Sequence, residues 1–362
     1  MAAQAVSRRF QRYATSKPLR NNPLLRTSSH PHILTYFSTN TCSRISPRAS
    51  TSSSFPSYIP PRVQEIREDA AIQAARRIER KEVLVFDKPV QASFIGPSQS
   101  RSTDDTHHRK TNIVMLHGFD SSCLEFRRLI QALEGRSDAV AVYAVDILGW
   151  GFFEADDSID YSPLSKREYL KQFISNNVGD KVVLIGCSLG GACAIDFAVH
   201  HRDLVDGLVL IDAQGYIDGL GQMSTMPDLF LKAGLYVLRS WPLRNYANNI
   251  SYFDKDKFAT DDAVRIGRLH CFTKDWIKAT MRFMKSGGYQ ISESIPKVSQ
   301  KTLILWGDAD NILSASYAEK FANDIDNSSI EWIEKAGHVP HLEKPLRVAD
   351  AVLNFFAIEK KL

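Results

Sequence analysis

The feature that most constrains the fold of this chain is a repeated alternation of short apolar runs with longer helix-like segments. Each run is too short to form an amphipathic helix, so a buried strand is the better interpretation. The runs cover residues 112–116, 141–147, 181–186, 207–212, 302–307 and 330–334. Segments such as LEFRRLIQALEG and GGACAIDFAVHH lie between them. This alternation predicts an α/β fold, with a mostly parallel sheet covered by helices on both faces.

Two further strands are expected before this region, in EVLVF (82–86) and QASFIG (91–96), where they would form a hairpin. An amphipathic helix or a semi-ordered lead-in is expected over 62–80, and a polar surface loop over 97–111.

One interval breaks the alternation. Residues 214–297 separate two apolar runs and have the pattern of several helices. A structureless loop of that length is improbable in a compact domain, so we expect a helical insertion. The catalytic domain would then consist of 62–213 and 298–362. Residues 213–297 contain 12 basic and 8 acidic residues, which favours either a solvated helix face or contact with an anionic substrate or membrane surface.

The first 61 residues have the composition of a targeting peptide. Residues 1–64 contain nine Lys and Arg but no Asp or Glu, and they are rich in Ser and Thr without a long apolar stretch. We expect this segment to be disordered and to direct the protein to the chloroplast; a mitochondrial address is the alternative. The rest of the chain is mildly acidic, which argues against nucleic acid as a partner. No transmembrane helix is expected, and peripheral membrane contact and oligomeric state stay open.

The five cysteines show no paired spacing and are expected to be reduced thiols. His107 and His108 have no neighbouring cysteine or second histidine cluster. We therefore expect no metal and no cofactor.

Polar motifs follow four of the expected strands, where functional groups gather in a parallel sheet. His117-Gly118-Phe119-Asp120 follows the first run, and Gly186-Cys187-Ser188-Leu189-Gly190 follows the third. Asp310 and His338 follow the last two runs. A serine flanked by glycines between a strand and a helix is typical of a nucleophile on a strained turn, because the glycines allow close packing. We therefore interpret Ser188 as a nucleophile.

A serine nucleophile needs a base, and an acid that orients that base. His338 is the candidate base; His341 competes with it, and we interpret His341 as a structural residue. Asp310 is the candidate acid, ahead of Asp308 and Asp212. Backbone N–H groups of Phe119 and Leu189 are the expected oxyanion donors. The turns that carry these two donors are expected to be supported by His117, Gly118, Gly186 and Gly190.

The chain from about residue 82 resembles the α/β-hydrolase superfamily. The resemblance rests on HGF (117–119), DILGWG (146–151), GCSLGG (186–191), WGDADNI (306–312) and GHVPHLEKP (337–345). It is similar to the lidded branch that contains meta-cleavage-product-hydrolase-like and epoxide-hydrolase-like proteins. The resemblance implies an eight-stranded sheet, a helical cap inserted after strand 6, and the triad Ser188, Asp310 and His338. Serine at position 188 argues against epoxide and dehalogenase chemistry.

The chain has a phenylalanine and a cysteine at two positions within or directly after the motifs that carry this resemblance. Phe152 stands where the family usually has serine, which we expect to alter the mouth of the pocket. Cys187 is interpreted as a buried spacer and not as a second nucleophile.

The sequence therefore predicts a serine hydrolase that cleaves an ester, or a similar acyl bond, of an apolar small molecule or lipid. One alternative is a hydrolase of C–C bonds of the meta-cleavage type. The other is a ligand receptor that retains the triad. An acyltransferase is disfavoured because His338 is followed by Glu343 and not by an aspartate at that spacing.

Overall fold

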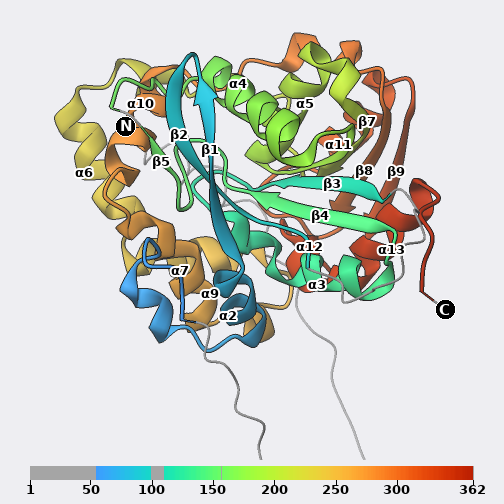
Figure 1. Cartoon of the computed structure of the whole chain (residues 1–362), viewed down its shortest axis with the longest axis horizontal. Coiled ribbons are helices and arrows are strands. Elements are labelled where there is room, and N and C mark those ends of the chain that lie inside the picture. Colours follow the sequence, from blue (N-terminus) through green and yellow to red (C-terminus); the bar gives the residue numbers. More distant parts are fainter. Residues whose placement is uncertain (1–53, 99–109, 156, 362) are drawn as a thin grey trace, which may run out of the picture. The chain divides into compact units, whose positions relative to one another are not determined.

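A computed structural model describes residues 54–98, 110–155 and 157–361. Most of the expected targeting segment at 1–61 and most of the expected loop at 97–111 lie outside the described residues. Figure 1 shows a central sheet with helices on either side of it.

The sheet has nine strands, and eight of them form a continuous path in the order β1-β2-β4-β3-β6-β7-β8-β9. From β4 to β9 all pairs are parallel, whereas β1–β2 and β2–β4 are antiparallel. The ninth strand, β5, has two residues and pairs with β2, which is why the eight expected strands become nine. The strands are β1 Ile78–Val85, β2 Lys88–Ile95, β3 Thr111–Leu116, β4 Val140–Val145, β5 Glu154–Ala155, β6 Val182–Cys187, β7 Val205–Ile211, β8 Lys301–Gly307 and β9 Ser328–Ile333.

Strand order reverses between β3 and β6. The chain passes from β3 to β4 on one side and then returns to place β6 on the other side of β3. Loops leaving the carboxyl ends of two such strands diverge and leave a crevice between them, where ligands of open α/β sheets bind. The loops after β3 and β6 carry His117 to Asp120 and Ser188.

Alternate residues of each central strand point to opposite faces, because side chains alternate along a strand. In β3, Ile113 and Met115 join the apolar cluster on one face, and Val114 and Leu116 join the cluster on the other. The first face is covered by α2 (Asp69–Arg76), α3 (Arg127–Arg136) and α13 (Pro345–Phe355). The second is covered by α4 (Pro163–Phe173), α5 (Leu189–His200) and α11 (Ser316–Asp324). The parallel sheet is therefore buried on both sides, as the apolar runs indicate.

The N-terminal part of the described chain differs from the sequence expectation. In place of one helix over 62–80, a 3₁₀ turn (Pro61–Glu65) is followed by α2, and β1 already begins at Ile78. Pairing of Ile78 with Ile95 accounts for the early strand, because the ladder with β2 overrides local helix preference. Ile59 is buried in the same apolar cluster as α3. The boundary expected at residue 61 therefore lies within ordered structure.

All the helical elements of the interval 214–297 lie between β7 and β8 in the chain, and we call this interval the cap. Its α-helices are α6 (Asp228–Leu238), α7 (Trp241–Ser251), α8 (Lys255–Phe258), α9 (Asp261–Leu269) and α10 (Trp276–Lys285). The side chains of Ser240 and Thr260 accept hydrogen bonds from the first turns of α7 and α9 and so set where these helices begin. Within the described ranges, no helix is both long enough and apolar enough to span a bilayer.

Candidate active site

Ser188 occupies the turn between β6 and α5, with φ 50° and ψ −121°. A non-glycine residue rarely adopts a positive φ, and such strain tends to occur at functional sites. The flanking glycines are needed for space: a Cβ at Gly186 would overlap the backbone of Gly190, and a Cβ at Gly190 would overlap the backbone of Leu116 and His117. The turn is held by hydrogen bonds from Ser188 N–H to the Ile211 carbonyl (3.0 Å) and from Gln214 N–H to the Ser188 carbonyl (2.8 Å).

His117 holds the turn that follows β3. Its Nε2 accepts a hydrogen bond from Ile147 N–H (3.0 Å), so its Nδ1 carries the proton and donates to the Gly118 carbonyl (2.8 Å). Burial lowers the pKa of His117, which favours this neutral form. In a trans peptide the next N–H points away from the carbonyl. Thus the contact with His117 sets the direction of the Phe119 N–H.

Glu125 fixes the other side of the same turn. Both of its carboxylate oxygens lie 3.2 Å from Gly118 N. Burial would raise the pKa of Glu125, but His341 and His117 outweigh it and lower the pKa to about 2. Gly118 has little room as well, since a Cβ there would lie 3.4 Å from the Cβ of Ser188. The turn after β3 is therefore packed directly against Ser188.

Leu189 is the first residue of α5, immediately after Ser188. Its N–H belongs to the first turn of a helix, where N–H groups lack intrahelical partners and the helix dipole favours negative charge. Phe119 and Leu189 both line one apolar cavity, described below.

His338 lies in the loop after β9, and its Nδ1 is 2.8 Å from Oδ2 of Asp310. The second carboxylate oxygen of Asp310 accepts hydrogen bonds from the N–H groups of Ile312 (2.7 Å) and Leu313 (3.1 Å). Burial would raise the pKa of Asp310, but the hydrogen bond and charge of His338 outweigh it and leave that pKa below its usual value. Asp310 is thus an ionised acceptor that orients the ring of His338.

The two competing aspartates occupy different positions. Asp308 accepts a long hydrogen bond (3.4 Å) from Ala336 N–H and takes no part in the contact with His338. Asp212 is fully buried beside Asp310, with Oδ1 3.0 Å from Gly307 N. Burial, and then the charge of Asp310, raise the pKa of Asp212 well above its usual value. Asp212 is therefore a buried neighbour of the carboxylate that contacts His338, and its surroundings favour its protonated form.

His341 lies behind the Ser188 turn, on the short helix α12 (Pro340–Glu343). It is fully buried, with Nε2 3.5 Å from Glu125 and Nδ1 3.7 Å from Cys187 Sγ. Burial raises the pKa of the Cys187 thiol well above its usual value, which disfavours a thiolate. These three side chains contact one another beside the turns after β3 and β6, and two of them, Glu125 and Cys187, also line the cavity that contains Ser188.

Two adjoining cavities lie at this edge of the sheet. The first, of about 360 Å³, is lined by Ser188, His338, Phe119 and residues of α7 and α9. The second, of about 520 Å³, is lined almost entirely by apolar side chains, with Gln214 as its one amide. Phe119, Leu238 and Leu243 line both cavities. Both volumes are in the range of small-molecule sites.

Asp120 connects the turn after β3 to the cap. Its buried carboxylate accepts hydrogen bonds from Arg244 of α7, from Trp276 Nε1 (2.6 Å) and from His270 Nε2 (2.9 Å). Burial would raise the pKa of Asp120, but these partners leave it well below the usual range. Burial would also lower the pKa of His270, yet Cys271 and Asp120 raise it to about 9. One carboxylate next to Phe119 therefore joins three segments of the cap.

The cap also contacts the loop of His338. His338 N–H donates to the carbonyl of Ser251, the last residue of α7 (2.8 Å). Glu343 accepts hydrogen bonds from Gly337 N–H (2.7 Å), Phe253 N–H (3.1 Å) and Asp254 N–H (3.0 Å). Glu343 therefore binds the loop of His338 to the segment between α7 and α8.

The expectation for Phe152 is wrong. This residue is fully buried in the apolar cluster of the α3 face, and it lines neither cavity. Its N–H donates to Asp146 (2.9 Å). An aromatic ring is accommodated here because the side chain points into the core and not toward the site.

Three clusters of described side chains bring potential metal-binding atoms within 4.8 Å of one another. Each contains an aspartate or glutamate that already accepts hydrogen bonds from backbone or side-chain donors. We assign a metal to none of them. The clusters are Asp120, His270 and Cys271; Glu125, Cys187 and His341; and Asp212, Asp310 and His338.

Comparison with known proteins identifies the family. Residues 113–351 match the model of the alpha/beta hydrolase family. The chain is 33% identical over 305 residues to the alpha/beta hydrolase domain-containing protein VTE7 of Arabidopsis thaliana, covering 83% of this chain and 90% of that protein. It is 29% identical over 226 residues to 2-hydroxy-6-oxo-6-(2'-aminophenyl)hexa-2,4-dienoic acid hydrolase of Metapseudomonas resinovorans, covering 60% of this chain and 73% of the relative.

Solved structures agree on the fold. A serine hydrolase involved in carbazole degradation (the CarC enzyme) superimposes with a TM-score of 0.60 at 24% identity, over 78% of this chain and all of the other. An esterase from Exiguobacterium antarcticum gives a TM-score of 0.60 at 17% identity, over 76% and 99% of the two chains. The family match, the identity to VTE7 and the sheet with its strand-end motifs lead to one conclusion: this chain belongs to the α/β-hydrolase family.

Proposed function

We propose that the protein is a serine hydrolase that cleaves an ester, or a similar acyl bond, of an apolar small molecule or lipid. The observation that carries this proposal is that Ser188 and His338 line one cavity while His338 is 2.8 Å from Asp310. An ionised acid, a histidine and a strained serine in that arrangement can generate an oxygen nucleophile near neutral pH.

In the proposed mechanism, Ser188 Oγ attacks the acyl carbon while Nε2 of His338 takes its proton. Asp310 accepts the hydrogen bond from Nδ1 and stabilises the imidazolium. The N–H groups of Phe119 and Leu189 bind the negative oxygen of the tetrahedral intermediate. His338 then protonates the leaving alcohol, and the C–O bond of the ester breaks. Water activated by His338 hydrolyses the acyl-enzyme, releasing the acid and restoring Ser188.

The apolar cavity supports a substrate with a long or bulky apolar part. Phe119 lines both cavities, so an acyl group whose carbonyl oxygen accepts a hydrogen bond from the Phe119 N–H has the apolar cavity directly beside it. Burial of each methylene of a chain there contributes about 0.8 kcal/mol to binding. The second cavity is thus the proposed site of the apolar part of the substrate.

We also propose a plastid location. The acid-free, hydroxyl-rich start of the chain supports it, as does the identity to a plant protein.

The proposal is tested with an activated fluorophosphonate probe and a series of p-nitrophenyl esters of increasing acyl length. We expect the wild-type protein to be labelled and to hydrolyse these esters. The variant Ser188→Ala should lose labelling and lose hydrolysis by several orders of magnitude. Ser299→Ala, which removes an exposed serine outside both cavities, is the matched control and should behave as wild type. Undiminished labelling of Ser188→Ala would refute the proposal.

A second candidate function, hydrolysis of a C–C bond, is favoured by the relative from Metapseudomonas resinovorans, whose name describes a dienoic acid hydrolase. A vinylogous diketone substrate in the same assay separates the two. Turnover of the diketone without turnover of any ester would replace the ester proposal. Tight binding of a ligand without turnover of either substrate would favour a receptor.

A further inference from the structure

Helix α6 is unusual among the described helices because most of its apolar side chains are exposed. Only Leu231 and Leu235 of its 11 residues are buried. Four large apolar side chains of α6 are largely in solvent: Leu229 (74% exposed), Phe230 (63%), Val237 (60%) and Tyr236 (48%). Contiguous exposed apolar surface of this kind marks an interaction site more often than chance.

The two flanks of α6 border different hollows. Phe230, Leu231, Gly234, Leu235 and Leu238 line the apolar cavity beside the Ser188 turn. On the other flank, a groove of about 590 Å³ lies between α6 and α10. A helix turns by about 100° per residue, which places these two sets on different sides of α6. One thin helix thus separates the surface of the cap from the proposed substrate cavity.

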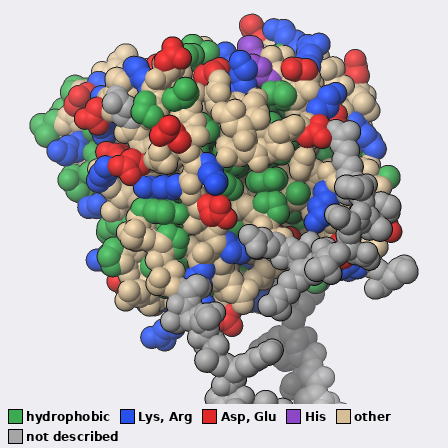
Figure 2. Space-filling view, in the orientation of Figure 1, with side chains coloured by type: hydrophobic (Ala, Val, Ile, Leu, Met, Phe, Trp, Pro, Cys, Tyr) green, Lys and Arg blue, Asp and Glu red, His purple; other side chains and the backbone are tan. Residues whose placement is uncertain are grey.

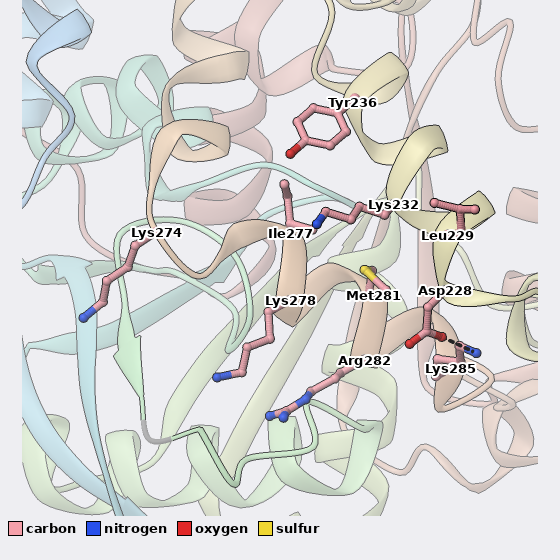
Figure 3. A pocket seen from close by; sticks show the side chains of 10 residues that line it. All are labelled: Asp228, Leu229, Lys232, Tyr236, Lys274, Ile277, Lys278, Met281, Arg282 and Lys285. Atoms are coloured by element: carbon pink, nitrogen blue, oxygen red, sulfur yellow. Dashed lines mark ion pairs between the residues drawn. The ribbon is translucent and has the colours of Figure 1, made fainter.

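The groove combines positive charge with an apolar floor. It is lined by five basic side chains and one acidic side chain, and by Leu229, Tyr236, Ile277 and Met281. Figure 3 shows Lys274, Lys278 and Arg282 extending toward one side, with the Asp228–Lys285 ion pair (2.7 Å) at one end. The basic residues are Lys232, Lys274, Lys278, Arg282 and Lys285.

Part of this charge is balanced by neighbours. Lys274 contacts Glu154, and Lys278 contacts Asp157. With Asp228, the three carboxylates leave an excess of two positive charges. Lys232 makes no ion pair with any residue that the structure describes. Exposed ion pairs contribute at most about 1 kcal/mol, so these cations can exchange their partners for other anions.

We propose that the exposed face of α6 and the groove beside α10 form a docking surface for a lipid bilayer that contains anionic lipids. The apolar side chains of α6 enter the boundary between headgroups and acyl chains, and the lysines contact the phosphates. An amphipathic helix with cations beside its apolar face binds the bilayer interface in this way. In Figure 2, apolar and basic side chains lie next to one another at the edge where Figure 1 places α6.

The proposed docking surface adjoins the apolar cavity, so it can deliver a lipid substrate to that cavity. Phe230 belongs to both, since it is exposed on α6 and lines the cavity. A lipid leaving the bilayer at α6 would pass Phe230 and reach the wall formed by Phe119 without crossing bulk water. The docking surface extends the proposed function, because it rests on a lipid-like substrate and names the bilayer as its source.

The test measures flotation of the full-length chain with vesicles of phosphatidylcholine alone or of an equimolar mixture with phosphatidylglycerol. We expect binding to the anionic vesicles that weakens as salt is raised. The double variant Leu229→Gln/Lys232→Gln should bind at least tenfold more weakly, since one lysine near an anionic surface is worth about fivefold. The matched control Leu346→Gln/Lys181→Gln also removes an exposed leucine and an exposed lysine, but outside the cap, and it should bind as wild type.

A second measurement excludes binding through the basic N-terminal segment. Hydrogen exchange of the peptide that contains α6 should slow when anionic vesicles are added. Equal binding by wild type and the cap variant, or unchanged exchange of α6 on bound protein, would overturn the proposal. Both measurements are made without turnover. The docking proposal can therefore be refuted while the proposal of hydrolysis by Ser188 holds, and hydrolysis can be refuted while docking holds. The cap variant should retain wild-type hydrolysis of a short soluble ester, because neither position lines the two cavities.

Discussion

The loops that carry Ser188, Asp310 and His338 and the helix α6 are built in opposite ways. The turn of Ser188 is held by backbone hydrogen bonds to Ile211 and Gln214. The loop of His338 is held by Asp310 and by the carbonyl of Ser251, both distant in sequence, and by Glu343. Helix α6 is attached mainly by two buried leucines and has large apolar side chains in solvent. Atoms that react need fixed positions, whereas a surface through which a substrate enters must be able to move. The difference predicts that substitutions in the two regions have different consequences.

The largest effect is expected at the contact between Asp310 and His338. Asp310→Asn keeps the shape of the side chain but removes the charge and favours the wrong tautomer of His338. We expect kcat for ester hydrolysis to fall by about three to four orders of magnitude, measured at saturating substrate. Asp212→Asn is the matched control, and its kcat should stay within about tenfold of wild type. Equal losses of kcat in both variants would mean that Asp310 and Asp212 together, and not Asp310 alone, act as the acid that orients His338.

An intermediate effect is expected at Asp120. Asp120→Asn leaves Arg244 and the protonated His270 buried without a full counter-charge, which costs about 3 kcal/mol of unfolding free energy. Asp228→Asn removes an exposed ion pair in the first turn of α6 and should cost less than about 1 kcal/mol. Urea unfolding followed by circular dichroism measures both. Similar losses at the two positions would mean that α6 is held as firmly as the site loops.

The smallest effect, taken over one pH unit, is the pH dependence of stability that Asp212 causes. The pKa of Asp212 is raised in the folded protein, so folding binds a proton once the pH exceeds the pKa of the unfolded chain. Stability should therefore fall as pH rises from about 4, by at most about 1.4 kcal/mol per pH unit. Asp212→Asn removes this titration. We expect its Tm to rise relative to wild type between pH 5 and pH 8, whereas a constant difference would contradict the assigned protonation state.

Much of the fold could be predicted from local patterns. Six apolar runs after residue 111 correspond to β3, β4, β6, β7, β8 and β9, and the interval 214–297 is helical. Ser188 lies on the strained turn that its flanking glycines indicated, and its role as the nucleophile stays a prediction. The early start of β1 was missed, because pairing with β2 decides it and local pattern does not.

The residues that hold the site could not be found in the same way. Asp120 is 156 residues from Trp276, and Glu343 is 90 residues from Phe253. Local sequence patterns therefore do not predict these contacts. A weak signal existed in both cases. Asp120 directly follows the HGF motif, and Glu343 follows His338 within the last motif. An acidic residue in an otherwise apolar or glycine-rich loop needs buried donors, but the sequence does not show which part of the chain supplies them.

The hydrogen bond from His338 N–H to the carbonyl of Ser251 limits how this protein can open. A lid that swung away as a rigid body would pull the end of α7 from the loop of His338 and so dismantle the proposed base each time a substrate entered. Admission and catalysis would then exclude one another. Because α6 is separate from that contact, a local displacement of α6 can admit a substrate while the base stays assembled. The cap therefore combines a fixed part, α7 with its contact to the loop of His338, and a part that can move locally, α6.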